Sequence, residues 1–566
     1  MPRLTRTFTL ILSSVLIAGV HSGCMSEQLA HYDVIIRNGA IYDGSGTPSY
    51  TGDLAIHGDR IVAVGAFKAT AELELDATSL AIAPGFINML SWAPTSLIAD
   101  GRSQGDIRQG VTLEVFGEGQ SYGPLNDAMK SLFKKSQGDI QFDIEWTTLG
   151  EYLEYLENRG ISTNVASFVG ASTVRVHELG YEDRAPSKEE LLTMQELVRA
   201  AMREGALGVG SSLIYAPAFY AKTDELIALA QAAGEFEGMY ISHMRSEGNR
   251  LLESLDELIQ IAEQANVAAE VYHLKMSGKD NWSKFDAVVK RINDARARGL
   301  KITTDMYTYP AGSTGLDAAM PPWVQEGGYD AWRKRLQDSE IRTRVIKEMN
   351  TPTDQWENLM RAAGAEKMLL VGFRNKKLRH LIGKTLAEVA KSRGASAEET
   401  AINLVIEDGS RVQVVYFLMS EENVAKKVAL PWMSFGSDAG SFATEGVFLK
   451  QSTHPRAYGN FARLLGRYVR EQQVITLEEA IAKLSQKPAS NLKLRDRGSL
   501  KEGYFADVVV FDPTTVIDTA TFDKPHSYAK GMHHVFVNGK LVLHNGEHTN
   551  ATPGRVVRGP GWVGWD

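Results

Sequence analysis

Cysteine is almost absent from this chain, because Cys24 is the one cysteine among 566 residues. A single cysteine cannot form an internal disulfide, and its position near the N-terminus excludes a thiol nucleophile or a cysteine-based metal cluster in the folded part. An excess of positive charge is also absent, since 61 Lys and Arg residues stand against 69 Asp and Glu residues, for a net charge of −8. No segment forms a basic stripe, so nucleic acid is not an expected partner.

Long apolar runs are scarce, and the clearest one lies near the N-terminus. It covers residues 8–20 behind two arginines and is too short to span a bilayer comfortably. We therefore expect residues 1–24 to be a signal peptide. Cys24 stands where a bacterial lipoprotein would be cut and lipidated, although His21 replaces the usual aliphatic residue. Two alternatives stay open: a freely exported periplasmic protein, or a lipoprotein anchored to a membrane through Cys24.

The rest of the chain has the length and pattern of one large domain with a smaller companion. Residues 32–83 alternate short β-like runs with turns, and residues 490–566 repeat this pattern. We expect these two terminal segments to form one small β-sandwich domain. Residues 84–489 alternate short apolar strands with helical patterns, which is typical of βα units around a parallel sheet.

Eight strand candidates in the central region predict a closed (β/α)8 TIM barrel, so the fold class is α/β. They are Gly85–Leu90, Thr112–Glu118, Asn164–Gly170, Ala206–Ser212, Met239–Met244, Ala269–Lys275, Lys301–Tyr307 and Trp432–Ser437. Two further β-like runs, Met368–Gly372 and Val412–Met419, precede the last candidate and disturb the count. We interpret residues 315–411 largely as an insertion in the barrel.

Polar residues at the ends of these strands are the candidates for chemistry, because active sites of such barrels lie at the C-terminal ends of the strands. His243 and His273 end two successive strands and are expected to lie side by side. Two imidazoles and one carboxylate suffice for a catalytic zinc site, and Glu118, at the end of the second strand, can supply the carboxylate. Asp438 follows the last strand and is placed to transfer a proton to and from water. Taken singly, a histidine at a strand end is more often a structural group, and Glu118 between two glycines could be a turn carboxylate.

Longer stretches around these residues resemble the D-aminoacylase, or N-acyl-D-amino-acid deacylase, family of the amidohydrolase superfamily. The matching stretches are Ala83–Ile87, Gln109–Thr112, Gly205–Gly208, His243–Gly248, His273–Lys275, Gly436–Ala439, His454–Gly459, Asp496–Gly498, Gly503–Asp507 and Val537–Gly539.

The resemblance implies a role for each candidate. It implies that His243 and His273 bind zinc and that Asp438 is the catalytic base. It also implies that Lys275, Tyr307, Ser313 and Arg456 hold the carboxylate of an N-acyl-amino acid or polarise its carbonyl, for which cationic groups are suited.

The chain departs from the family pattern at several metal-binding positions. Asn88-Met89-Leu90 replaces a His-x-His motif after strand one, and Glu118 stands near the position of a cysteine ligand. The strand-four lysine that bridges two metals in other members has no counterpart in Val209–Leu213, and the family's histidine after strand three is absent behind Gly170.

These departures favour a single ion, most simply Zn²⁺, with Mn²⁺ or Fe²⁺ as alternatives because a carboxylate is a harder ligand than a thiolate. The predicted function is metal-dependent hydrolysis of the amide bond of N-acyl-amino acids, with an N-acyl-D-amino acid as the substrate implied by the resemblance. Two rivals stay open: a cyclic-amide or dipeptide hydrolase of the same superfamily, and an exported binding protein without catalytic activity.

Overall fold

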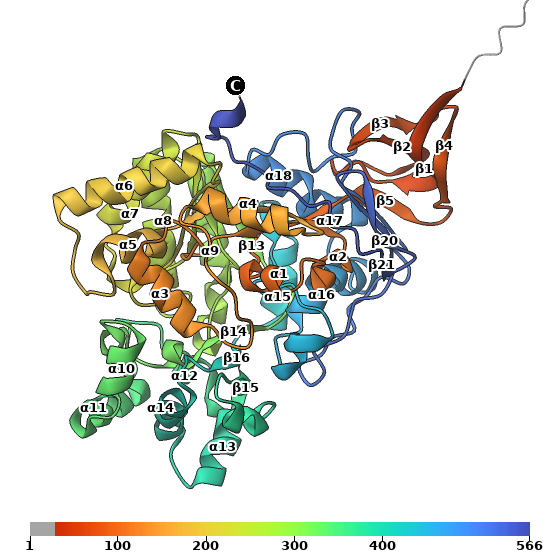
Figure 1. Ribbon diagram of the computed structural model, residues 1–566. Helices are drawn as coiled ribbons and strands as arrows, with labels where there is room; N and C mark the ends of the chain where they lie inside the picture. The colour runs from red at the N-terminus through yellow and green to blue at the C-terminus, as the bar shows by residue number, and fades with distance from the viewer. Residues whose placement is uncertain (1–28, 566) are drawn as a thin grey trace, which may run out of the picture.

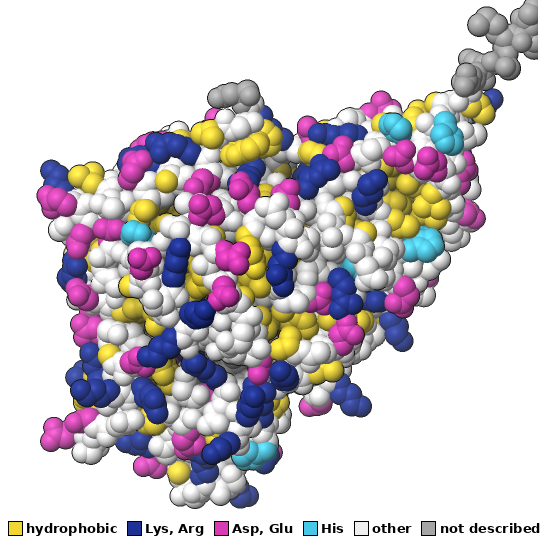
Figure 2. Space-filling view, viewed as in Figure 1, with side chains coloured by type: hydrophobic (Ala, Val, Ile, Leu, Met, Phe, Trp, Pro, Cys, Tyr) yellow, Lys and Arg dark blue, Asp and Glu magenta, His cyan; other side chains and the backbone are white. Residues whose placement is uncertain are grey.

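The computed structural model describes residues 29–565, and its chain folds as alternating strands and helices with a mixed sheet at one end (Figure 1). The predicted leader and Cys24 lie outside the described residues, so export and lipid anchoring stay predictions. No helix within residues 29–565 is long and apolar enough to cross a membrane. On the face drawn in Figure 2, basic and acidic side chains are interspersed.

Both ends of the chain contribute to one nine-stranded sheet within residues 29–565, at the right of Figure 1. Its order is β21-β20-β19-β18-β5-β1-β2-β3, with β4 beside β1. The N-terminal and C-terminal parts meet where β5 pairs antiparallel with β18. The strands are β1 (Ala30–Ile41), β2 (Tyr50–His57), β3 (Arg60–Gly65), β4 (Ala69–Asp76), β5 (Ala81–Pro84), β18 (Val508–Phe511), β19 (Met532–Val537), β20 (Lys540–His544) and β21 (Glu547–His548). The two segments thus join as expected, whereas a two-layered sandwich stays a prediction.

All eight strand candidates of the central region form strands and pair in parallel. One sheet has the order β6-β7-β8, and a second has the order β17-β13-β12-β11-β10-β9. Their bounds are β6 (Phe86–Asn88), β7 (Val111–Phe116), β8 (Asn164–Ser167), β9 (Val169–Gly170), β10 (Gly208–Ser212), β11 (Met239–His243), β12 (Ala269–Val271), β13 (Ile302–Met306) and β17 (Met433–Phe435). The third candidate is divided at Phe168 into β8 and β9.

Backbone hydrogen bonds link these two sheets at both ends. The Leu207 N–H donates to the Ser167 carbonyl, which connects the third and fourth strand candidates at 3.0 Å. The Met89 N–H donates to the Phe435 carbonyl at 3.1 Å, which connects the first and last candidates. Buried apolar parallel strands need helices packed on them, and amphipathic helices supply this cover.

Helices follow most of these strands and several pack against them, as α7 does against β10 and α9 against β13. They are α1 (Pro94–Ala99), α2 (Gln104–Ile107), α3 (Asp127–Ser136), α4 (Leu149–Arg159), α5 (Ala171–Leu179), α6 (Lys188–Arg203), α7 (Thr223–Gly234), α8 (Leu251–Ala265), α9 (Phe285–Ala297), α15 (Glu421–Val428), α16 (Arg456–Arg463), α17 (Leu477–Leu484) and α18 (Gln486–Asn491). Several begin with a capping box, such as the one in which Ser187 and Glu190 satisfy each other's backbone N–H at the start of α6.

The two runs that disturbed the strand count belong to a separate sheet. Its antiparallel order is β14-β16-β15, with β14 (Ala311–Gly315), β15 (Met368–Gly372) and β16 (Gln413–Phe417). Helices α10 (Tyr329–Arg335), α11 (Ser339–Asn350), α12 (Leu359–Ala363), α13 (Leu386–Arg393) and α14 (Ala397–Asp408) surround it at the bottom of Figure 1. This part has its own hydrophobic cluster, which includes Trp332, Leu370 and Val414. The domain bounds expected from the sequence stay predictions.

Candidate metal centre and substrate cavity

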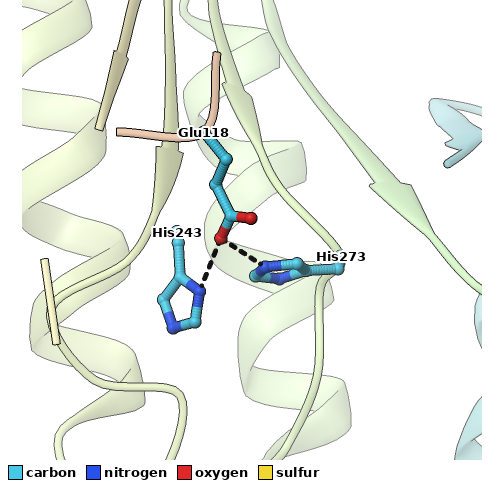
Figure 3. Close-up of side chains that lie close together, drawn as sticks. All are labelled: Glu118, His243 and His273. Atoms are coloured by element: carbon cyan, nitrogen blue, oxygen red, sulfur yellow. Dashed lines mark hydrogen bonds and ion pairs between the residues drawn. The ribbon is translucent and has the colours of Figure 1, made fainter. Parts of the chain in front are cut away.

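Glu118, His243 and His273 converge at the C-terminal ends of β7, β11 and β12 (Figure 3). The Oε1 atom of Glu118 lies 2.9 Å from Nδ1 of His243 and 3.0 Å from Nε2 of His273. The two imidazole centroids are 4.5 Å apart, and all three side chains are buried. The histidines therefore lie side by side, as the order of their strands predicted.

Two glycines give Glu118 its direction. Gly117 and Gly119 flank it with φ of +110° and +69°, in the left-handed region that favours glycine. A Cβ at Gly117 would lie 2.4 Å from the Phe168 carbonyl oxygen, and one at Gly119 would lie 2.7 Å from the Ser212 Cβ. The chain therefore turns sharply after β7 and directs Glu118 toward the histidines rather than into solvent.

The three side chains fit a divalent cation. Zinc lies about 2.0–2.2 Å from nitrogen and oxygen ligands in a tetrahedral site, so neighbouring ligand atoms should be about 3.3 Å apart. The observed separations of 2.9 and 3.0 Å require small outward shifts of the imidazoles. Within residues 29–565, these three form the one group of at least three His, Cys, Asp or Glu ligands whose atoms all lie within 4.8 Å of one another. The three residues predicted to hold a metal thus form a possible metal site.

The segment Asn88-Met89-Leu90, which replaces the His-x-His motif of the family, makes structural contacts. The amide of Asn88 donates to Asp106 Oδ1 and Ser437 Oγ, both at 2.9 Å, and its carbonyl accepts from the Ser437 N–H at 2.8 Å. Leu90 is fully buried. These side chains offer no second set of ligands.

Charges around the centre strongly perturb its titration. Burial raises the pKa of Glu118, but His273 and His243 outweigh it and hold that pKa well below its usual range. Burial and Lys275 lower the pKa of His273, yet Glu247 and Glu118 outweigh them and raise it to about 10. A metal ligand must be unprotonated, so binding of an ion would release the proton of His273.

Asp438 and Arg456 lie next to each other beyond the last strand. The Arg456 Nη1 atom is 2.9 Å from Asp438 Oδ2, and both side chains line the same cavity as the metal centre. Burial raises the pKa of Asp438, and the charge of Arg456 opposes that rise. Asp438 has a φ of +50° and His273 a φ of +35°, which are strained values for side chains other than glycine. Strain of this kind concentrates at functional sites, where it fixes side-chain directions.

Tyr307 lies between two cations. Its ring centroid is 4.4 Å from the Arg456 guanidinium carbon and 5.6 Å from Lys275 Nζ. The Tyr307 hydroxyl is buried and has no hydrogen-bond partner among residues 29–565. Burial raises its pKa, so the hydroxyl stays protonated near neutral pH. It is thus free to donate a hydrogen bond to a bound carbonyl or carboxylate.

Ser313 and Lys275 also line the cavity but have partners already. Ser313, on β14, donates to the Val414 carbonyl at 3.1 Å. Lys275 contacts both carboxylate oxygens of Glu247 at 2.8 and 2.9 Å. All eight residues singled out from the sequence line one cavity of about 1180 Å³: Glu118, His243, His273, Lys275, Tyr307, Ser313, Asp438 and Arg456.

Two residues with no predicted role contact the centre. Trp92 donates from Nε1 to Glu118 Oε2 at 2.9 Å, and Glu247 contacts His243, His273 and Lys275. Glu247 stands in the His243–Gly248 stretch, so an acid in a loop directly after a strand-end histidine was an available signal. No periodicity singles out Trp92.

Comparison with known proteins identifies the family. A model of the amidohydrolase family matches residues 124–543. The chain belongs to this family. It is 32% identical to a D-aminoacylase of Alcaligenes xylosoxydans xylosoxydans over 532 residues, which cover 93% of this chain and 97% of that protein. It is 31% identical to an N-acyl-D-aspartate deacylase of the same organism, over 96% of this chain and 98% of that one.

The solved structure of a relative supports the assignment of the fold. The N-acyl-D-glutamate deacylase of Bordetella bronchiseptica, complexed with zinc and a phosphonate inhibitor that mimics the tetrahedral intermediate, superposes with a TM-score of 0.75 at 28% identity. The alignment covers 94% of this chain and all of that one. This amidohydrolase therefore has the α/β fold of the deacylases, and the resemblance inferred from its motifs is confirmed.

Proposed function

We propose that this amidohydrolase cleaves the amide bond of N-acyl-amino acids, with an N-acyl-D-amino acid as substrate, using one zinc ion held by Glu118, His243 and His273. The observation that carries the proposal is the convergence of these three ligands in one cavity with Asp438 and Arg456. The relatives named as deacylases of D-amino acids support the substrate class and the D configuration. Mn²⁺ and Fe²⁺ are alternative ions for this oxygen-containing ligand set.

A bound ion would polarise the amide carbonyl and lower the pKa of a water molecule. Asp438 accepts the proton of the water that attacks the amide carbon and later delivers it to the leaving nitrogen. The C–N bond breaks, and the products are a carboxylate and a free amino acid. Arg456, Lys275 and Ser313 hold the substrate carboxylate, while Tyr307 donates to the developing oxyanion.

The pair formed by Arg456 and Asp438 couples binding to base strength. The guanidinium opposes the rise in the pKa of Asp438 while the two are 2.9 Å apart. A substrate carboxylate that draws on the same guanidinium weakens this effect. Asp438 is then a stronger base when substrate is bound than when the cavity holds only water.

We also propose that the eight parallel strand candidates close into a (β/α)8 barrel. The hydrogen bonds between Leu207 and Ser167, and between Met89 and Phe435, support this closure. The same arrangement explains why Glu118, His243 and His273 meet, since each lies at or just beyond the C-terminal end of a strand.

A substrate panel with metal analysis tests the proposal. Purified full-length protein should hold about one zinc per chain and release amino acid from N-acyl-D-amino acids, and His273→Ala should lose both properties. Faster turnover of cyclic amides or dipeptides would favour the first rival. Metal-free protein that binds N-acyl-amino acids without cleaving them would favour the inactive binding protein.

A further inference from the structure

We propose that Glu247 is a positioning residue that orients both metal-binding histidines, an inference that rests on the proposed function. It lies in the loop after β11, four residues beyond His243, and its side chain is buried. Its carboxylate reaches His243 Nε2 at 3.4 Å through Oε2 and His273 Nδ1 at 3.1 Å through Oε1. One side chain thus reaches both imidazoles.

The two contacts are on the ring nitrogens that face away from the proposed ion. His243 turns Nδ1 toward Glu118, whereas His273 turns Nε2 toward it. Each imidazole therefore lies between two carboxylates, Glu118 on the ligand side and Glu247 on the other. A nitrogen that binds a metal carries no proton, so the proton of each neutral ring must be on the nitrogen that faces Glu247.

A carboxylate at that place selects the required tautomer of both rings. It accepts the N–H of His273 at hydrogen-bond distance, and a shift of a few tenths of an ångström brings it within reach of His243. The His243 Nε2 atom is buried and makes no hydrogen bond within the described part of the chain, so the closer contact would satisfy it. Without Glu247, two buried N–H groups would lose their acceptor.

The position of Glu247 is itself fixed on several sides. Its backbone N–H donates to Glu357 Oε2 at 2.5 Å, and its carbonyl accepts from the Ser277 N–H at 2.8 Å. The Lys275 ammonium contacts both carboxylate oxygens and neutralises their charge. Lys275 Nζ also lies 2.7 Å from His273 Nδ1, and this contact must loosen once Nδ1 carries a proton.

Zinc affinity of full-length Glu247→Gln, measured by competition with a chromophoric chelator, tests the assignment. Loss of a group that accepts a hydrogen bond from a metal-bound histidine typically lowers metal affinity by about 10- to 100-fold. The dissociation constant for zinc should therefore rise by that factor. Nitrogen NMR of the zinc-loaded, histidine-labelled protein should show shifted signals for His243 Nε2 and His273 Nδ1, because their N–H groups no longer face a carboxylate. Glu253→Gln, an exposed acid in the first turn of α8, is the matched control and should bind zinc like the wild type.

Two results would overturn the assignment. If Glu247→Gln binds zinc within twofold of the wild type and leaves these nitrogen signals unchanged, Glu247 does not position the histidines. If Lys275→Met weakens zinc binding as much as Glu247→Gln does, the effect comes from the ion pair instead. Wild-type protein that binds no zinc would instead refute the proposed function and this inference together, so the two failures are distinguishable.

Discussion

Replacement of Glu118 by glutamine tests the metal centre most directly. The change keeps the size of the side chain and removes its negative charge, leaving a neutral amide oxygen that is a poor ligand for zinc. Glu118 Oε1 is the atom that both imidazoles share, at 2.9 and 3.0 Å. Removal of the negative charge from this oxygen should therefore weaken zinc binding more than removal of any contact around the three ligands.

The magnitude follows from the number of ligands. Structural zinc sites with four ligands have apparent binding free energies of about 10–16 kcal/mol, or about 2.5–4 kcal/mol for each ligand. At 1.4 kcal/mol for each factor of ten, Glu118→Gln should raise the dissociation constant for zinc by roughly 10²- to 10³-fold. Chelator competition on purified protein measures this change, with zinc content by atomic emission as a second readout.

Glu114→Gln is the matched control for this experiment. Glu114 is a buried acid within β7, four residues before Glu118, and its carboxylate accepts from Ser91 at 2.6 Å and Thr163 at 2.9 Å rather than from the histidines. Folded Glu114→Gln protein should keep the zinc affinity of the wild type. The reasoning is refuted if Glu118→Gln binds one zinc per chain within threefold of the wild-type affinity.

Three further predictions concern the substrate side of the cavity. Asp438→Asn should lower kcat by about 10²- to 10⁴-fold, because the variant loses its general base. Its zinc content should stay unchanged, because Asp438 is not a proposed metal ligand. A variant that loses zinc would contradict the assignment of Asp438 as the base. Arg456→Met should lower kcat/KM by about 10- to 100-fold through loss of a charged hydrogen bond. Arg456→Met should also move the acid limb of the pH profile to higher pH. Burial already raises the pKa of Asp438, the pKa rises further without the charge of Arg456, and the active carboxylate is lost as pH falls through that pKa. An acid limb that does not move would show that Arg456 does not affect the pKa of Asp438. Three apolar side chains, Trp92, Leu132 and Phe133, line the cavity, and the first two are 42% and 37% exposed. Longer acyl chains can bury more apolar surface against them, so KM for a series of N-acyl-D-amino acids should fall from acetyl to octanoyl. Leu132→Asp should remove that trend.

Much of the scaffold could be predicted because its signals are local. Eight short apolar runs in the central region were predicted as strands and all of them form strands, and two of these runs, Met239–Met244 and Ala269–Lys275, carry a histidine near their C-terminal end. The runs at Met368–Gly372 and Val412–Met419 were also β structure, but only the pairing of β15 and β16 with β14 showed that they belong to another sheet. Apolar composition indicates a strand, whereas the partner of that strand depends on contacts far along the chain.

The sequence by itself determined which residues stand at strand ends, because alternation and turn residues act over a few positions. It did so for Glu118, His243 and His273, and the family resemblance indicated the proposed substrate contacts. Only the tertiary structure decided that Glu118 meets partners 125 and 155 residues away and that Glu247 lies behind both histidines. Such meetings depend on how the strands pair and on the left-handed turns at Gly117 and Gly119, and no local pattern encodes the distance between two side chains.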